Sequence, residues 1–174
     1  MGFYDRFILP HLINCACGGR AFAKQRSFVV PEARGRVLEV GLGSGLNLPL
    51  YSSEYVSEVV GIEPSPSISK LANKRIDDCE FPVTVVESTA ESTDLESASF
   101  DTVLVTYTLC TITEPSLALT EMARLLKPGG KLVYCEHGLS PEESVANWQR
   151  RLNPAWGAIG GGCRLDTDIP ALIR

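Results

Sequence analysis

The sequence predicts an α/β protein in which helices cover both faces of a mostly parallel β-sheet. Short, nearly continuous apolar segments alternate along the chain with segments of helical spacing. The first apolar segment runs directly into a glycine-rich turn, and polar residues follow most of the others. Strands buried on both faces lose the polar alternation of half-exposed strands, so this pattern indicates a parallel sheet between layers of helices.

Five apolar segments are predicted to be the strands of this sheet. They are 36–40, 56–62, 83–87, 101–106 and 131–136. In an open parallel sheet the carboxyl ends of the strands lie along one edge, and ligands bind in the crevice outside that edge. The residues that follow each strand are therefore the candidates for a binding site.

Helices are predicted at the N-terminus and between the strands. Apolar residues recur at helical spacing from Phe3 to Cys17, and Pro10 predicts a kink or break there. Residues 1–30 are thus expected to form a helical cap ahead of the sheet. Further helices are predicted to begin near Leu46, to cover 65–75 after capping residues, and to cover 115–126, whereas 127–130 should form a turn.

The glycine-rich turn carries Gly41, Gly43 and Gly45, and Glu39 stands two residues before the first of these glycines. Glycine adopts left-handed backbone conformations at low cost and lets a ligand approach the main chain. A helix that begins after the turn would add unpaired N–H groups and a partial positive charge. The segment therefore predicts a cradle for a nucleotide-like cofactor, in which Glu39 could simply cap the turn by accepting its main-chain N–H groups.

The identity of the cofactor depends on position 46 and on the acid after the second strand. A dinucleotide-binding turn needs a small residue at position 46, where Leu46 stands, so a nicotinamide-dependent oxidoreductase is the less favoured alternative. Glu63 follows the second strand and is itself followed by Pro64. A carboxylate at this place accepts hydrogen bonds from both ribose hydroxyls of an adenosine cofactor.

The composition favours a single domain, over residues 1–174, that acts on small molecules. A net charge of −5 argues against nucleic acid as a partner, because phosphate binding needs a basic surface. No apolar run approaches the roughly 20 residues of a membrane span. Asp5 and Arg6 also stand where a signal peptide would be apolar. We therefore expect a cytoplasmic protein without stable membrane insertion.

Six cysteines are scattered through the chain, and only Cys15 and Cys17 lie close together in sequence. A zinc site usually shows about four ligands at recognisable spacing. No second cysteine pair accompanies these two residues, so no metal site is expected. Cys110, which follows the fourth strand, is interpreted as a small apolar core residue.

Several motifs resemble those of one enzyme family. The pattern Glu-x-Gly-x-Gly-x-Gly at 39–45 resembles motif I of the class I S-adenosylmethionine-dependent methyltransferases, which have a Rossmann-like fold. Other motifs resemble a bacterial branch of the type 11 methyltransferases. That branch is similar to the methyltransferase-like thiol S-methyltransferases and, more loosely, to phosphatidylethanolamine and ubiquinone/menaquinone methyltransferases. These motifs are 1–6, Tyr107-Thr-Leu-Cys110, 121–130, Glu136-His137-Gly138, and Trp148-Gln149 through Gly161-Gly-Cys163.

The resemblance implies S-adenosylmethionine as the cofactor and assigns residues to it. The glycine loop would hold the methionine end, and the residues after the third strand would meet the adenine ring. Tyr4, in a lid, and Trp148, in a helical cover, are the candidates for substrate binding. The implied cofactor-binding residues are Glu39, Gly41, Gly43, Gly45, Asn47, Glu63, Pro64, Thr89, Ala90 and Tyr107.

Methyl transfer from a sulfonium is an in-line displacement, so the protein mainly orients the reactants in a dry cavity. The acceptor is expected to be a small-molecule or lipid-like compound that offers a thiol, an amine or a quinol. A protonated acceptor needs a base, whereas a thiol with a pKa of about 8.5 already supplies some thiolate at neutral pH. His137 is the candidate base, with hydrogen bonding to the backbone at a strand end as its alternative role.

Family members continue past the fifth strand with further strands, so this sheet is expected to lack its C-terminal closing strands. Residues 132–135 would then form an exposed apolar edge, through which two copies could pair as a homodimer. A non-catalytic protein that binds S-adenosylmethionine is the alternative function that the short C-terminus leaves open.

Overall fold

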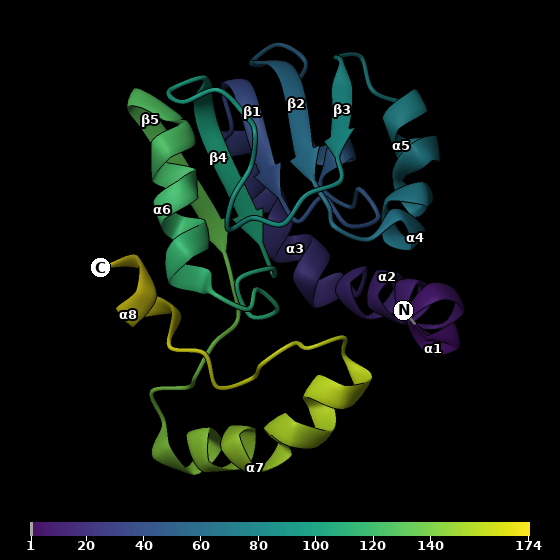
Figure 1. Ribbon diagram of the computed structural model, residues 1–174, viewed down its shortest axis with the longest axis vertical. Helices are drawn as coiled ribbons and strands as arrows, with labels where there is room; N and C mark the ends of the chain where they lie inside the picture. Colours follow the sequence, from purple (N-terminus) through teal and green to yellow (C-terminus); the bar gives the residue numbers. More distant parts are fainter. Residues whose placement is uncertain (1) are drawn as a thin grey trace.

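Five parallel strands form one sheet in the order β3-β2-β1-β4-β5. The structure is a computed structural model, and it describes residues 2–174 (Figure 1). Helices lie on both sides of the sheet, which confirms the predicted fold class. The strands are β1 (Gly35–Val40), β2 (Val56–Ile62), β3 (Val83–Val86), β4 (Phe100–Thr106) and β5 (Leu126–Cys135).

Two hydrophobic clusters bury the two faces of the sheet. Along β1, Leu38 and Val40 belong to one cluster, and Val37 belongs to the other. Helix α6 (Pro115–Leu125) contributes Met122 and Leu125 to the first cluster. Because successive side chains of a strand point to opposite faces, burial on both faces explains why the strands read as continuous apolar runs.

The N-terminal segment forms three helices, which are α1 (Phe3–Phe7), α2 (Leu9–Cys17) and α3 (Arg20–Val29), followed by the 3₁₀ turn η1 (Val30–Glu32). The break predicted at Pro10 falls at Ile8, which leaves Pro10 in the first turn of α2. Proline is tolerated there because the first N–H groups of a helix have no partner within the helix. Helices α1 and α2 lie beyond the carboxyl ends of the strands (Figure 1).

The helix predicted to begin near Leu46 is absent from the described chain, and that prediction was wrong. A turn follows the glycines, and only the 3₁₀ turn η2 (Leu48–Leu50) precedes the loop to β2. Pro49 lacks an N–H donor, and β2 already begins at Val56, so the connection is too short to hold a stable α-helix. The glycine turn consequently has no helix N-terminus behind it.

Two other local predictions need correction. The helix predicted over 65–75 consists of α4 (Pro66–Ser69), η3 (Lys70–Ala72) and α5 (Asn73–Asp77). Its expected cap is not formed, because the Ser65 side chain makes no cap hydrogen bond while its main-chain N–H donates to Glu63. The turn predicted over 127–130 belongs to β5, where a register shift in the pairing with β4 accommodates it.

The C-terminal part consists of α7 (Glu143–Ile159) and α8 (Ile169–Ile173). Helix α7 lies apart from the sheet, beyond the carboxyl ends of the strands (Figure 1). Helix α8 returns to the sheet, where Ile169 joins the first hydrophobic cluster. Within residues 2–174, every helix is too short or too polar to cross a bilayer.

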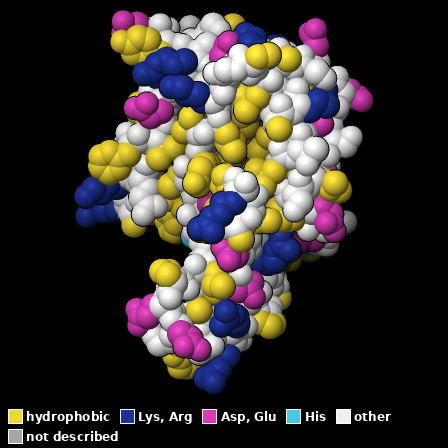
Figure 2. Space-filling view, turned by 90° about the vertical axis from the view of Figure 1, so that its left-hand side faces the viewer, with side chains coloured by type: hydrophobic (Ala, Val, Ile, Leu, Met, Phe, Trp, Pro, Cys, Tyr) yellow, Lys and Arg dark blue, Asp and Glu magenta, His cyan; other side chains and the backbone are white. Residues whose placement is uncertain are grey.

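Strand β5 forms one edge of the sheet and pairs only with β4 among the described residues. Tyr134 of β5 is 46 % exposed. Figure 2 looks at the side on which β5, α6 and α8 lie in Figure 1, and hydrophobic side chains gather there in the upper, larger part of the molecule. An apolar edge of this kind can pair with another strand, and the homodimer stays a prediction.

Candidate functional site

A cavity of about 500 Å³ lies at the carboxyl ends of the strands. Cavities of this size commonly hold small ligands. Helices α1 and α2 provide one wall of the cavity, and the segments after β1, β2, β3 and β4 provide the others. Nine residues that the sequence assigned to the cofactor line it, namely Glu39, Gly41, Gly43, Asn47, Glu63, Pro64, Thr89, Ala90 and Tyr107.

The three glycines after β1 all have positive φ angles, of 75°, 58° and 76° at Gly41, Gly43 and Gly45. They serve different purposes. A Cβ on Gly41 would collide with the side chain of Thr108, and a Cβ on Gly45 would lie 2.9 Å from Leu48 Cδ1. The space beside Gly43 is open, with no atom nearer than 3.8 Å to such a Cβ. Gly41 and Gly45 therefore allow close packing, while Gly43 keeps the main chain accessible from the cavity.

Glu39 on β1 is a buried acid, with 1 % of its surface exposed. Its carboxylate accepts hydrogen bonds from Asn47 Nδ2 at 2.9 Å and from the Tyr51 hydroxyl at 2.7 Å. Burial raises the pKa of Glu39 to about 7, although these two hydrogen bonds oppose the rise. The idea that Glu39 caps the turn through main-chain N–H groups was therefore wrong, because its partners are side chains.

Glu63 joins the end of β2 to the glycine turn. One of its carboxylate oxygens accepts from the Gly43 N–H at 3.0 Å, and the other accepts from the Ser65 N–H at 2.9 Å. Burial raises the pKa of Glu63, against the effect of these two hydrogen bonds. Each carboxylate oxygen can accept more than one hydrogen bond, so both keep capacity for a ligand in the cavity.

Arg26 on α3 is a site residue that the sequence analysis missed. It is 5 % exposed and is the only basic side chain among the described residues that line the cavity. Its Nη1 donates to the Cys17 carbonyl at 2.6 Å, and its guanidinium carbon lies 4.8 Å from the centre of the Tyr107 ring. Its Nε is buried and has no hydrogen-bond partner within residues 2–174. Such an unpaired donor is costly and marks a place where a ligand could bind.

Tyr107 follows β4 with a φ of 53°, which is uncommon for a residue other than glycine. Its ring packs edge-on against Phe22, with the ring centres 4.8 Å apart, and its hydroxyl is hydrogen-bonded to Gln25. Burial raises its pKa. Two contacts with α3 therefore hold this strained residue in the cavity wall.

Four residues assigned from the sequence are not among those that line the cavity, namely Tyr4, Gly45, His137 and Trp148. Tyr4 donates through its hydroxyl to the Ile159 carbonyl at 2.6 Å and so ties α1 to the end of α7. Trp148 is 62 % exposed on α7. Substrate binding by Tyr4 and Trp148 stays a prediction.

His137 lies in the segment after β5 and, like Arg26, is a neighbour of the Tyr107 ring. Its ring is nearly parallel to that of Tyr107, with centres 6.4 Å apart, and its Nε2 is 3.4 Å from Cys163 Sγ. Hydrogen bonds with Cys110 and His137 lower the pKa of the Cys163 thiol, although burial opposes this. These contacts turn the imidazole toward sulfur, and its role as a catalytic base stays a prediction.

Comparison with known proteins identifies the family. The family described as a methyltransferase domain matches residues 38–134, from β1 to β5. The chain belongs to this methyltransferase family. Its cofactor is S-adenosylmethionine, as the resemblance of the glycine loop implied.

Similar methyltransferases include enzymes with different acceptors. Rat thiol S-methyltransferase TMT1B is 35 % identical over 133 residues, which are 74 % of this chain and 54 % of that protein. Phosphatidylethanolamine N-methyltransferase from Cereibacter sphaeroides is 36 % identical over 117 residues, 66 % of this chain and 57 % of the relative. The chain thus spans little more than half the length of these relatives.

Among solved structures, a methyltransferase from Thermotoga maritima is similar in fold, with a TM-score of 0.69. That protein is described as S-adenosylmethionine-dependent and as a possible histamine N-methyltransferase. It is 26 % identical, and the match covers 98 % of this chain and 77 % of that one. The fold of the whole described chain therefore agrees with that of a methyltransferase.

Proposed function

We propose that this methyltransferase binds S-adenosylmethionine in the cavity at the strand ends and transfers its methyl group to a thiol. The observation that carries this proposal is the distribution of charged groups along the cavity. Glu63 lies at the end of β2, whereas Glu39 and the unpaired Arg26 Nε lie toward β1 and α3. An adenosine cofactor with a zwitterionic amino-acid tail needs hydrogen-bond acceptors at its ribose and both signs of charge at its tail.

The nucleoside half of the cofactor is assigned to the ends of β2 and β3. Glu63 accepts hydrogen bonds from the two ribose hydroxyls, and its existing bonds to Gly43 and Ser65 hold the carboxylate in place. The adenine ring lies against Thr89 and Ala90, which line the cavity after β3. Pre-ordered acceptors improve affinity because little freedom is lost on binding.

The methionine half is assigned to the glycine turn, Glu39, Asn47 and Arg26. The Glu39 carboxylate attracts the cofactor's ammonium group, and Asn47 Oδ1, buried without a partner in the described chain, accepts from it. The Arg26 Nε–H donates to the cofactor's carboxylate. These contacts satisfy two polar atoms that are otherwise orphaned, which supports this orientation over the reverse one.

A thiol is the acceptor that fits the cavity and the relatives best. No histidine or lysine lines the cavity within residues 2–174, and Arg26 stays protonated, so a protonated amine would find no imidazole or amine base there. A thiol with a pKa of about 8.5 supplies a few per cent of thiolate at pH 7 without help. Four of the similar proteins are animal enzymes named thiol S-methyltransferases, at 32–35 % identity. Positioning the thiolate in line with the methyl group then supplies most of the acceleration.

The proposal is tested by measuring transfer of tritiated methyl groups from S-adenosylmethionine to a panel of small thiols, amines, quinols and phospholipids. We expect transfer to thiols, with a rate that rises with pH in step with the thiolate fraction of the acceptor. Glu63→Ala should abolish measurable transfer at low cofactor concentration. Glu58→Ala is the matched control, because Glu58 is also on β2 but pairs with Arg36 outside the cavity. Transfer to amines or quinols alone would refute the choice of acceptor, and cofactor binding without any transfer would favour a non-catalytic binding protein.

A further inference from the structure

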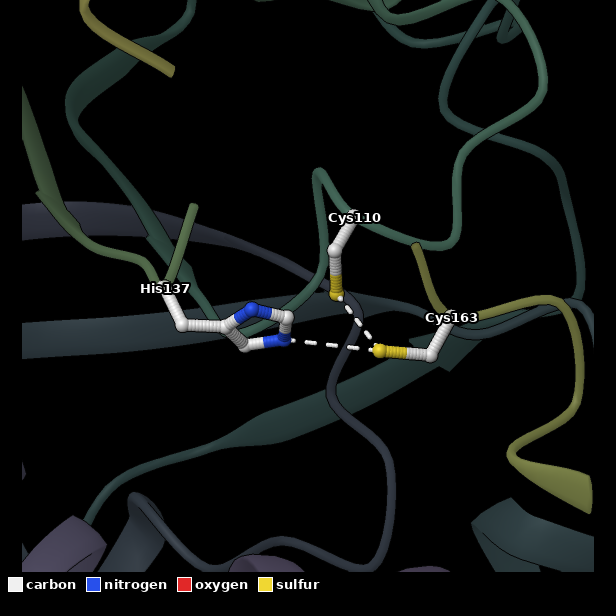
Figure 3. A group of neighbouring side chains, drawn as sticks. All are labelled: Cys110, His137 and Cys163. Carbon is white, nitrogen blue, oxygen red and sulfur yellow. Dashed lines mark hydrogen bonds between the residues drawn. The ribbon is translucent and has the colours of Figure 1, made fainter. Parts of the chain in front are cut away.

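Cys110, His137 and Cys163 meet at one point although they come from three separate segments (Figure 3). Cys110 is in the loop after β4, His137 follows β5, and Cys163 lies in the turn after α7. The Cys163 Sγ is 3.5 Å from Cys110 Sγ and 3.4 Å from His137 Nε2, and the three atoms lie within 4.8 Å of one another. The proposed methyl transfer uses none of these three groups.

Other hydrogen bonds hold the three segments together independently of these side chains. The Glu136 carboxylate accepts from the N–H groups of Thr108 and Leu109, at 2.7 and 3.1 Å, and so fixes the Cys110 loop to the segment of His137. The N–H of Arg164 donates to the Cys110 carbonyl at 2.9 Å and fixes the turn of Cys163 to the same loop. The cluster is therefore pre-organised by its surroundings.

The two separations that involve Cys163 Sγ suit a tetrahedral metal ion. Zinc binds thiolate sulfur at about 2.3 Å and imidazole nitrogen at about 2.0–2.1 Å. Tetrahedral angles then place two sulfur ligands about 3.8 Å apart, and a sulfur and a nitrogen ligand about 3.6 Å apart. The observed separations of 3.5 and 3.4 Å are each a few tenths of an ångström shorter. A small outward movement of the side chains would admit the ion.

We propose that Cys110, His137 and Cys163 bind a thiophilic divalent cation of the Zn²⁺ type. Two thiolates and one imidazole form a donor set that favours Zn²⁺ over the hard ions Mg²⁺ and Ca²⁺. Cys110 is 1 % exposed, so the ion would be partly shielded from water. No fourth His, Cys, Asp or Glu of residues 2–174 joins the cluster, which leaves a fourth position for water.

The bound ion would fix the turn after α7 to the loop after β4. This turn also contains Gly161, which lines the cofactor cavity. Loss of the ion is therefore expected to loosen α7 and the adjacent wall of the cavity. No metal site was expected from sequence spacing, because Cys163 is 53 residues from Cys110 and 26 from His137.

The test is a titration of the reduced protein with Co²⁺, followed by displacement with Zn²⁺. We expect one equivalent of Co²⁺ to give sulfur-to-metal charge-transfer bands and the visible bands of a tetrahedral ion. Loss of a residue that only hydrogen-bonds to a metal ligand weakens metal binding by about 10–100-fold. Cys110→Ser and Cys163→Ser remove a ligand itself, so each should weaken Co²⁺ binding by more than this. His137→Gln should shift the visible bands as well as weaken binding.

Cys15→Ser and Cys79→Ser are the control variants, because both cysteines lie outside the cluster. They should bind Co²⁺ with unchanged spectra, and circular dichroism should show that every variant is folded. The proposal is overturned if the folded wild type gives no thiolate bands. It is equally overturned if the cluster variants bind like the wild type, or if Cys15→Ser is the variant that removes binding. A Cys110–Cys163 disulfide that forms in air, with no metal binding after reduction, would identify a redox pair instead.

Discussion

The substitution Glu39→Gln isolates the energetic effect of the buried acid on β1. Glutamine has nearly the same shape, and it can keep hydrogen bonds with both Asn47 and Tyr51. It cannot ionise. Burial raises the pKa of Glu39 to about 7, so at higher pH the folded wild type carries a buried charge that lowers its stability. The variant never carries this charge.

The sign and size of the effect follow from the two pKa values. Below pH 4.5 Glu39 is neutral in both the folded and the unfolded protein. Between pH 4.5 and 7 it ionises only in the unfolded chain, so its contribution to stability is lost as pH rises through about 7. At about 1.4 kcal/mol for each pKa unit, the complete loss is on the order of 3 kcal/mol.

Urea unfolding of the ligand-free wild type and of Glu39→Gln, at pH values from 5 to 8, measures this effect. The unfolding free energy of the variant relative to the wild type should rise by about 2–3 kcal/mol over this range. Glu136, whose pKa burial also raises to about 7, titrates in both proteins and cancels in the difference. A difference that stays constant with pH, or that falls as pH rises, would refute a raised pKa for the buried Glu39.

Three further substitutions test the assigned contacts. Arg26→Met should weaken the binding of S-adenosylhomocysteine by about 10–100-fold in calorimetry. The binding of methylthioadenosine, which lacks the amino-acid tail, should not change. Equal losses of affinity for both ligands would contradict the Arg26 assignment. Glu63→Ala should lower the affinity for both ligands by at least about 10-fold, whereas Glu58→Ala should change neither affinity. An unchanged affinity of the Glu63→Ala protein would count against ribose binding by Glu63. The free energy of unfolding in urea should be about 1–3 kcal/mol lower for Gly41→Ala than for Gly43→Ala, because only a Cβ at position 41 collides with a side chain. Equal stabilities of the two variants would refute the packing argument.

The sheet was predictable from sequence because its strands are buried on both faces. Nearly continuous apolar runs such as 56–62 do not show the periodicity of an amphipathic helix, and the structure places β2 at the same residues. The helix near Leu46 was not predictable in this way. Its expectation came from the usual sequel to a glycine turn, whereas Pro49 and the short connection to β2 determine the local structure.

The candidate site was predictable where the chain itself brings residues to the strand ends. Glu39 and Glu63 sit at or next to those ends, so position along the strand sufficed to place them in the cavity. Arg26 carries no such signal, because it reaches the cavity from an amphipathic helix through packing against Tyr107. The cluster around Cys163 was hidden for a related reason, since its members meet only through long-range contacts.

Titration calorimetry of the wild-type protein with S-adenosylhomocysteine, and separately with NAD, tests the cofactor assignment most directly. Both ligands contain an adenosine, but only the first has an amino-acid tail for Glu39 and Arg26, and only the second has a pyrophosphate. We predict binding of one S-adenosylhomocysteine per chain and no measurable binding of NAD. Tight binding of NAD, or a folded protein that gives no heat with S-adenosylhomocysteine, would contradict the account.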